Sequence, residues 1–303
     1  MKIEKSCKFA FCNYPLSFCI SMSNNIILLS LSVFPVLLLG SYVYYKDKFQ
    51  KEPLGMLFKA FFFGCLSVVP AIFIESLLSA NYEIMFGNLL PDMFRGIYTG
   101  FIVAGFSEEL CKLLLLALAV WRSRYFDEYF DGIVYATFVS LGFAGLENIM
   151  YVFGQEDFGT SIATGTMRAI LAVPAHFLFG VVMGYYFAIA KFQPEHRFGN
   201  LVKAFIFPML LHGTYDSLLM VPEAMGVDGT LVSIGFFVLF IYFDIKLWKI
   251  GMRRLKGLQR LGEEQVYEGT YGGNSDRDGD LYGGDSGSGN GSQDPFSGFN
   301  WNV

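Results

Sequence analysis

The sequence predicts an all-α fold: a polytopic bundle of about seven transmembrane helices, followed by a disordered C-terminal tail. Its 303 residues are 53% hydrophobic and include 33 Phe and 17 Tyr. These apolar residues fall in blocks about twenty residues long, the length that an α-helix needs to cross a hydrocarbon core of roughly 30 Å. Segments such as IILLSLSVFPVLLL lack the polar face that a helix of a soluble bundle presents to water.

Seven blocks qualify as spans by their hydropathy. They cover residues 25–45, 54–78, 95–121, 131–153, 165–191, 200–221 and 230–250. Irregular backbone is tolerated at membrane depth only where protein or water covers it, so the spans are expected to be helices of one bundle. The segment 80–92, between the second and third spans, is expected to be a short interfacial or re-entrant piece.

The loops differ in charge. Basic residues follow the first, third, fifth and seventh spans: Lys46, Lys48, Lys51, Arg122, Arg124, Lys191, Arg197, Lys249, Arg253, Arg254, Lys256 and Arg260. The alternate loops, ANYEIMFGNLLPD, GQEDFGTS and VPEAMGVDG, contain no Lys or Arg. The positive-inside rule therefore predicts a multi-pass protein of the cell membrane with its N-terminus outside and its C-terminus inside. Lys2, Lys5 and Lys8 disagree with this orientation.

Residues 1–21 form a separate N-terminal segment. Their basic start and weak apolar run are compatible with a signal peptide, or with an upstream extension for which Met22 is the true start. We favour an extension, because Asn13 and Pro15 interrupt the apolar run.

Composition divides the rest of the chain into two parts. Residues 22–255 form the membrane-embedded domain, and residues 256–303 form a tail that is first basic and then acidic. From about Gly262 the tail is rich in Gly, Ser and Asp. Such a segment buries too little apolar surface to offset its ordering entropy, so we expect it to be disordered and cytoplasmic.

Charged and titratable groups lie inside spans three to six, although each costs about 2.5–3.5 kcal/mol at mid-membrane. They are Glu108, Glu109, Lys112, Glu147, His176, His212 and Asp216. Unless these groups meet one another, the arrangement is expensive.

The rise of an α-helix places several of these groups at a similar depth. Glu147 lies about 9 Å from the outer end of its span, and His212 lies about 13 Å from the outer end of its own. His176 lies about 12 Å inward of Arg168, and Glu108 lies about 15–20 Å inward of the start of the third span. The sequence therefore predicts one polar layer between the midplane and the outer face.

Local spacing suggests how the groups are arranged. His212 and Asp216 are four residues apart and share a helix face. Glu108 and Glu109 point about 100° apart, so both cannot face one small site equally well. Lys112 is spaced to neutralise whichever glutamate is not at the centre.

The residue types suit hydrolysis. Two imidazoles with carboxylates favour a divalent metal, with zinc the natural candidate. A metal lowers the pKa of water to about 7 while a free glutamate takes the proton. Without a metal, a glutamate–histidine pair can also activate water. Asn148 and Tyr151 are expected to supply supporting hydrogen bonds.

Four motifs carry a resemblance to a known family: EELCK, FDEYFDGIVYATFVSLGFAGLENIMY, PAHFLFG and HGTYD. In this order they resemble the PrsW family of intramembrane metalloproteases, related to CAAX prenyl endopeptidases and bacteriocin-processing proteins. The segment YYKDKFQKEPL also resembles the start of that family. The resemblance covers residues 28–221.

The resemblance implies roles for individual residues. It casts Glu108 as the general base and Glu109 as its essential neighbour. Glu147 ends an F-x-x-x-E stretch in which the wider superfamily has a histidine, and we expect it to serve in catalysis or as a metal ligand. His176 and His212 match the family histidines and are the other expected metal ligands.

Supporting roles follow in the same way. Asp216 occupies a position that is often Asn in CAAX proteases, and Lys112 and Asn148 are expected to orient the central groups. Glu128 matches the acid of the family's FDEP-x-DG element, in which Tyr129 here replaces the usual proline.

These observations predict an intramembrane endopeptidase that cuts a membrane-anchored protein near its extracytoplasmic end. The resemblance implies the first, site-1 cleavage of an anti-sigma factor in a stress response. The expected partners are this substrate and the lipid bilayer, with no nucleic acid. Two alternatives stay open: a non-catalytic membrane scaffold or immunity protein, and a proton- or metal-coupled transporter.

Overall fold

The computed structural model describes residues 16–47, 51–86, 89–227 and 230–271. Within these ranges the chain is almost entirely helical and has no strand. The elements are α1 (Leu16–Lys46), α2 (Leu54–Met85), α3 (Asp92–Tyr98), η1 (Thr99–Phe106), α4 (Ser107–Val120), α5 (Tyr129–Phe153), α6 (Phe158–Met167), η2 (Arg168–Ala172), α7 (Val173–Phe192), η3 (Pro194–His196), α8 (Arg197–Ala224) and α9 (Leu231–Tyr271). The predicted all-α class is confirmed.

Six helical segments among the described residues are long and apolar enough to cross a membrane. They are Ser23–Lys46, Leu54–Tyr82, Tyr129–Phe153, Phe158–Phe192, Pro194–Ala224 and Leu231–Gly257. Each corresponds to one of the predicted spans, so the chain is a multi-pass membrane protein.

The remaining predicted span, 95–121, is built differently. It consists of three helical pieces in direct succession, α3, η1 and α4, and no one of them is long enough to cross a bilayer alone. The middle piece, η1, is a π-helix. The span is therefore helical as predicted, but its winding changes just before the buried charges of α4.

Two expected boundaries differ from the structure. The segment 80–92 is not a separate piece at its start, because α2 continues as a helix to Met85. The tail expected from residue 256 begins as a helix, because α9 continues to Tyr271. Its sequence KGLQRLGEEQ is rich in the good helix formers Lys, Leu, Gln, Arg and Glu. The rest of the tail and the start of segment 1–21 lie outside the described residues.

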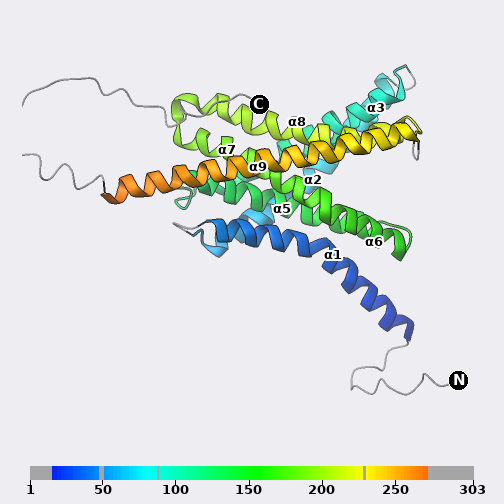
Figure 1. Ribbon diagram of the computed structural model, residues 1–303, viewed down its shortest axis with the longest axis horizontal. Helices are drawn as coiled ribbons and strands as arrows, with labels where there is room; N and C mark the ends of the chain where they lie inside the picture. Colours follow the sequence, from blue (N-terminus) through cyan, green and yellow to red (C-terminus); the bar gives the residue numbers. More distant parts are fainter. Residues whose placement is uncertain (1–15, 48–50, 87–88, 228–229, 272–303) are drawn as a thin grey trace, which may run out of the picture. The chain divides into compact units, whose positions relative to one another are not determined.

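Helix α5 lies at the centre of the bundle and packs against α1, α2 and α7, which run beside it in Figure 1. The helices approach one another closely at glycines, which have no side chain. A Cβ atom on Gly184 of α7 would collide with the carbonyl of Gly132 on α5, and one on Gly142 would collide with the carbonyl of Phe61 on α2. Small residues at helix contacts are the usual means of tight packing in membranes.

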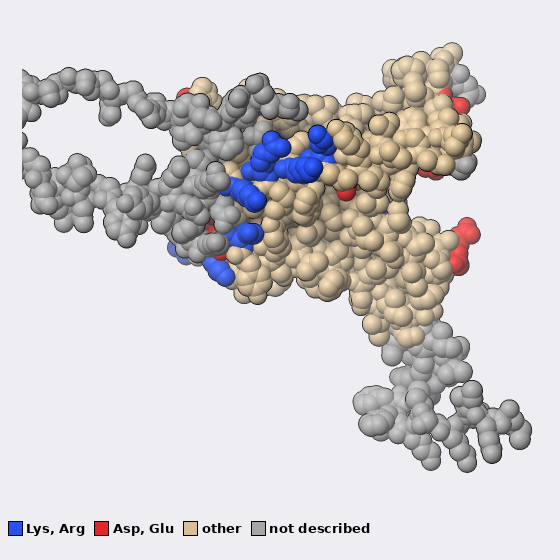
Figure 2. Space-filling view, in the orientation of Figure 1, with Lys and Arg blue, Asp and Glu red and all other residues tan. Residues whose placement is uncertain are grey.

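The outer helices present apolar side chains to their surroundings. Phe34 on α1 and Phe58 and Phe73 on α2 are all largely exposed. Most residues of α5 and α7 are buried instead. Figure 2 shows a surface that is mainly uncharged, with the visible Lys and Arg side chains gathered in its left half. This pattern is that of a bundle whose outer face lies in lipid.

Candidate active site

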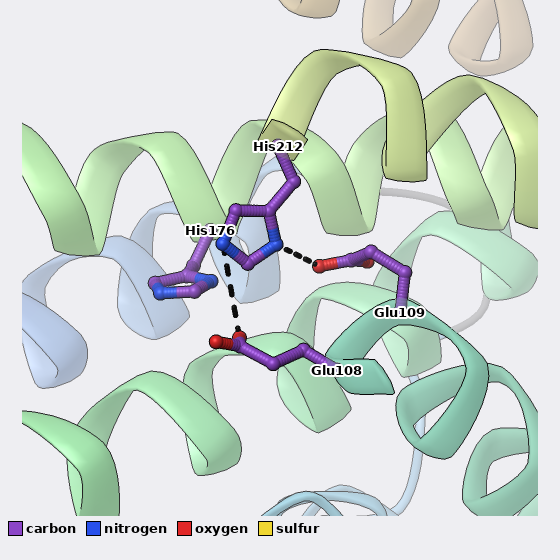
Figure 3. Close-up of side chains that lie close together, drawn as sticks. All are labelled: Glu108, Glu109, His176 and His212. Carbon is purple, nitrogen blue, oxygen red and sulfur yellow. Dashed lines mark hydrogen bonds and ion pairs between the residues drawn. The ribbon is translucent and has the colours of Figure 1, made fainter. Parts of the chain in front are cut away.

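Four titratable side chains from three helices meet inside the bundle. Helix α4 supplies Glu108 and Glu109, α7 supplies His176 and α8 supplies His212 (Figure 3). One possible ligand atom of each lies within 4.8 Å of the others, and all four residues are buried. The predicted convergence of acids and imidazoles is confirmed. We call these residues the four-residue group.

The ring of His212 links the two glutamates. Its Nδ1 atom lies 2.8 Å from Glu109 Oε1, and its Nε2 atom lies 3.8 Å from Glu108 Oε2. The same Nε2 lies 3.2 Å from Asp216 Oδ2. The predicted contact between His212 and Asp216, which are four positions apart on one face of α8, is therefore present. Phe179 stacks on the ring with its centroid 4.9 Å away. His212 is thus held in a fixed orientation.

Both glutamates reach the four-residue group, but they do not face the same space. Glu108 borders a cavity, whereas Glu109 is fully buried behind it. The two glutamates were expected to differ in how well they face one small site. They do differ, but in exposure to the cavity: both contact His212, and of the two only Glu108 lines the cavity.

Lys112 is the counter-charge of both glutamates. Its Nζ lies 3.0 Å from Glu108 Oε2 and 2.7 Å from Glu109 Oε1. It also lies 3.1 Å from His176 Nδ1 and 4.1 Å from the ring centroid of Phe143. The expectation that Lys112 neutralises one glutamate was too narrow, because the ammonium group has three donors and reaches both acids and the imidazole.

The contacts of His176 assign its tautomer. An ammonium group only donates, so Nδ1 accepts from Lys112. The other nitrogen, Nε2, then carries the proton and donates to Glu147 Oε2 over 3.0 Å. His176 is therefore a neutral imidazole whose ring is oriented by Glu147, an arrangement that is common around metal-binding histidines.

Glu147 lies on the outer side of the four-residue group, not among its members. Its carboxylate is engaged by His176 and, at 2.6 Å, by the guanidinium of Arg168. Arg168 Nε also donates to Asn148 Oδ1 over 2.9 Å, and Asn148 Nδ2 donates to the Ser32 carbonyl over 3.0 Å. Asn148 thus contacts the site through Arg168.

Arg168 was missed as a site residue. An arginine near the end of a predicted span usually extends its side chain to water, so the position of Arg168 in the sequence indicates no role at the site. It lies instead at the start of the π-helix η2, largely buried over the ring of Tyr151. The unusual winding of η2 carries no recognisable sequence signal.

Glu128 does not lie at the four-residue group. It caps the N-terminus of α5, where it forms a capping box with Asp131. Glu128 and Glu147 are 19 positions apart, which corresponds to about 28 Å at 1.5 Å per residue. The expected supporting role of Glu128 at the site therefore needs correction: sequence order placed it near the motif, but the length of α5 separates the two.

A cavity of about 650 Å³ opens beside the four-residue group. Its lining includes Glu108, Glu147, His176, His212 and Asp216, together with apolar side chains of α2, η1 and α9. Glu75 of α2 also lines this cavity. The polar groups thus have a path to molecules outside the bundle.

The four-residue group has the donors that a divalent metal requires. Two imidazoles and two carboxylates form a typical zinc ligand set. Glu109 Oε2 is buried and has no hydrogen-bond partner among the described residues, so one ligand atom is already available. Both nitrogens of His212 face carboxylates, and a metal would replace the proton on one of them. At His176 the ion would take the place of the Lys112 ammonium group on Nδ1, because Nε2 already donates to Glu147. With that exchange the residues present fit such an ion.

Comparison with known proteins gives one consistent result. The family model described as "PrsW family intramembrane metalloprotease" matches residues 52–243. The chain is 35% identical over 228 residues to "Protease PrsW" of Clostridioides difficile (strain 630), covering 75% of this chain and 89% of that protein. It is 34% identical over 240 residues to "Protease PrsW" of Bacillus subtilis (strain 168), covering 79% and 99%.

A third relative, "Protease PrsW" of Geobacillus kaustophilus (strain HTA426), is 37% identical over 229 residues, covering 76% of this chain and 91% of the relative. No solved structure matches the chain.

Proposed function

The chain belongs to the PrsW family of intramembrane metalloproteases, and we propose that its four-residue group hydrolyses a peptide bond of a membrane-anchored protein. The observation that carries this proposal is the meeting of Glu108, Glu109, His176 and His212 within 4.8 Å of one another beside an open cavity. We assign residues 22–255 to the protease domain.

Glu108 is the general base of this proposal. It borders the cavity, so it can take a proton from water that attacks the scissile carbonyl. Its carboxylate contacts both Lys112 and His212, which keep it aimed at the cavity. The same group can return the proton to the leaving amine, since a base that has accepted a proton becomes an acid for the next step.

The metal ligands of this proposal are His176, His212 and Glu109, which leaves Glu108 free as the base, and zinc is the ion that this donor set favours. When bound, a divalent ion polarises a carbonyl and makes water more acidic. Glu147 and Asp216 orient the two imidazoles, and Arg168 holds Glu147 in place. Lys112 balances the charge of the buried glutamates.

The position of the cavity supports a cut near the extracytoplasmic end of the substrate. The basic loops indicate that the N-terminus is outside and the C-terminus is inside. In this orientation the cavity beside the polar layer extends toward the extracytoplasmic ends of α5 and α8, where Tyr151 and Glu223 line it. A site-1 cut in an anti-sigma-factor-like protein with one span has this geometry.

The variant Glu108→Gln tests the proposal in membranes. It keeps the size and hydrogen bonding of the side chain but removes the base, so cleavage should fall by about 10²–10⁴-fold. Comparative membrane proteomics should reveal a single-span protein that is truncated in the wild type and intact in the variant. The matched control is Glu156→Gln, which removes an exposed acid and should cleave normally. Normal cleavage by Glu108→Gln would refute the proposed role.

The wild-type and Glu108→Gln membranes, together with a flux measurement on the purified protein, also distinguish a protease from the two alternatives. A scaffold or immunity protein would show no truncated product in either sample. A transporter would keep metal flux in proteoliposomes while producing no cleavage.

A further inference from the structure

A second cluster of acids lies at the opposite end of α5. Glu52, from the connection between α1 and α2, meets Asp127 and Asp131 at the start of α5. One carboxylate oxygen of each lies within 4.8 Å of the others. Asp131 and Glu147 are 16 positions apart on α5, or about 24 Å, so this acidic cluster is separate from the four-residue group.

The acidic cluster is held in place by its own hydrogen bonds. Asp131 Oδ2 accepts from the backbone N–H groups of Asp127 at 3.0 Å and Glu128 at 2.7 Å. The Tyr135 hydroxyl donates to Glu52 Oε2, and the Glu52 N–H donates to Asp47 Oδ2 over 3.2 Å. These bonds fix the carboxylates before any ligand arrives, which reduces the entropy lost on binding.

Two oxygens of this region are buried without a partner. Asp131 Oδ1 and Glu128 Oε1 have no hydrogen bond among the described residues, and Asp131 is 0% exposed. A buried acceptor left unpaired costs about 1–3 kcal/mol, and more when it is charged. The Asp131 carboxyl lies beside the Glu52 carboxyl, and two acids so placed need a shared proton or a cation between them.

We propose that Glu52, Asp127 and Asp131 bind a hard divalent cation, Ca²⁺ or Mg²⁺. The ligands are carboxylate oxygens, which these ions prefer over nitrogen or sulfur donors. Two oxygens bound to one Ca²⁺ ion at about 2.3–2.6 Å each lie no more than about 5 Å apart, and the carboxylate oxygens of the acidic cluster lie within 4.8 Å of one another. Asp127 is exposed, so an ion can enter from water.

The ion has a structural consequence. It joins the α1–α2 connection, through Glu52, to the turn that starts α5, through Asp127 and Asp131. Because α5 is the central helix and ends near the hydrolytic site, the acidic cluster anchors the element on which the bundle is packed.

Calorimetric titration tests the proposal on the full chain in detergent, stripped with EDTA and freed of chelator. CaCl₂ and MgCl₂ are titrated separately into wild type, Asp131→Asn and the control Glu156→Gln. Asparagine keeps an acceptor for the two backbone N–H groups but loses the charge. We expect saturable binding of at least one ion by wild type and control, weakened about tenfold or more in Asp131→Asn.

Two further variants keep the result decisive. Asp127→Asn, at an exposed position, replaces Asp131→Asn if the latter fails to fold, and should weaken binding in the same way. Glu108→Gln should bind Ca²⁺ or Mg²⁺ as wild type does, because it alters only the distant group. The proposal is overturned if wild type binds neither ion up to about 10 mM, or if both aspartate variants bind normally. In that case Glu52 and Asp131 share a proton instead.

Discussion

The two ends of α5 handle buried negative charge in opposite ways. At the four-residue group, Glu108 and Glu109 meet a buried lysine and two imidazoles, and Glu147 meets Arg168. At the acidic cluster, the described hydrogen-bond donors to Glu52 and Asp131 are a hydroxyl group and backbone N–H groups, and none of these donors is a cationic side chain. The first arrangement balances charge within the protein and leaves the ion a catalytic task. The second leaves the balance to an ion, whose task is structural.

Selective chelation should give the largest difference between the four-residue group and the acidic cluster, measured as peptide cleavage and as melting temperature. Phenanthroline, which binds transition metals but not Ca²⁺ or Mg²⁺, should lower peptide cleavage by about 100-fold or more, because it removes the Lewis acid. Thermal stability in the presence of Ca²⁺ should change little. EDTA, which also binds Ca²⁺ and Mg²⁺, should in addition lower the melting temperature. Cleavage that survives phenanthroline would show that the glutamate–histidine pair acts without a metal.

Removal of the buried lysine should have the next largest effect. Lys112→Met leaves two buried glutamates without their counter-charge, which should lower the free energy of unfolding by about 3–5 kcal/mol. Thermal unfolding in detergent measures the loss. Lys203→Met, which removes an exposed lysine of α8, is the control. Equal stability of the two variants would mean that the glutamates are protonated or metal-bound in the wild type.

Arg168→Gln should reduce cleavage by about 10–100-fold, the usual effect of losing a residue that orients a ligand. Arg168→Lys should recover part of the activity, because lysine can pair with Glu147 but cannot also hold Asn148 in the same fork geometry. A merely structural role would lower stability and leave the cleavage rate per folded molecule unchanged. Arg253→Gln, at an exposed position of α9, serves as the control.

The smallest expected effect is that of Glu52→Gln on the free energy of unfolding, and its sign should depend on whether the divalent ion is bound. In EDTA, Glu52→Gln removes repulsion within the acidic cluster and should stabilise the protein by about 1 kcal/mol. With saturating Ca²⁺ or Mg²⁺ the same variant should be less stable than wild type, because it has lost a ligand. Unfolding curves under the two conditions test this reversal. A variant that destabilises equally in both would argue for a purely packing role of Glu52.

The sequence was sufficient for the spans and for the residues that converge at the four-residue group. Burying Glu108, His176 or His212 in lipid is so unfavourable that their meeting could be inferred from helix rise alone. The long, uniform apolar runs of α1 and α2 were sufficient to predict transmembrane helices there.

Other features depend on three-dimensional contacts that no local pattern encodes. Glu128 and Asp131 cap α5, but they belong to the FDEYFDG motif, whose resemblance to the family suggested that Glu128 lies near the catalytic residues. Glu52 lies 75 positions before Asp127, so only the packed bundle reveals that they meet. The role of Arg168 likewise depends on the winding of η2.

The π-helix η1 has a consequence for how α4 is aimed. Each residue that a widened turn accommodates rotates everything downstream by about 100° relative to a regular helix. The rotational position of Glu108 and Glu109 relative to α8 is thus set by Thr99–Phe106, which ends two residues before Glu108. An insertion or deletion in that segment would swing the carboxylates away from His212 even if every apolar contact could be rebuilt.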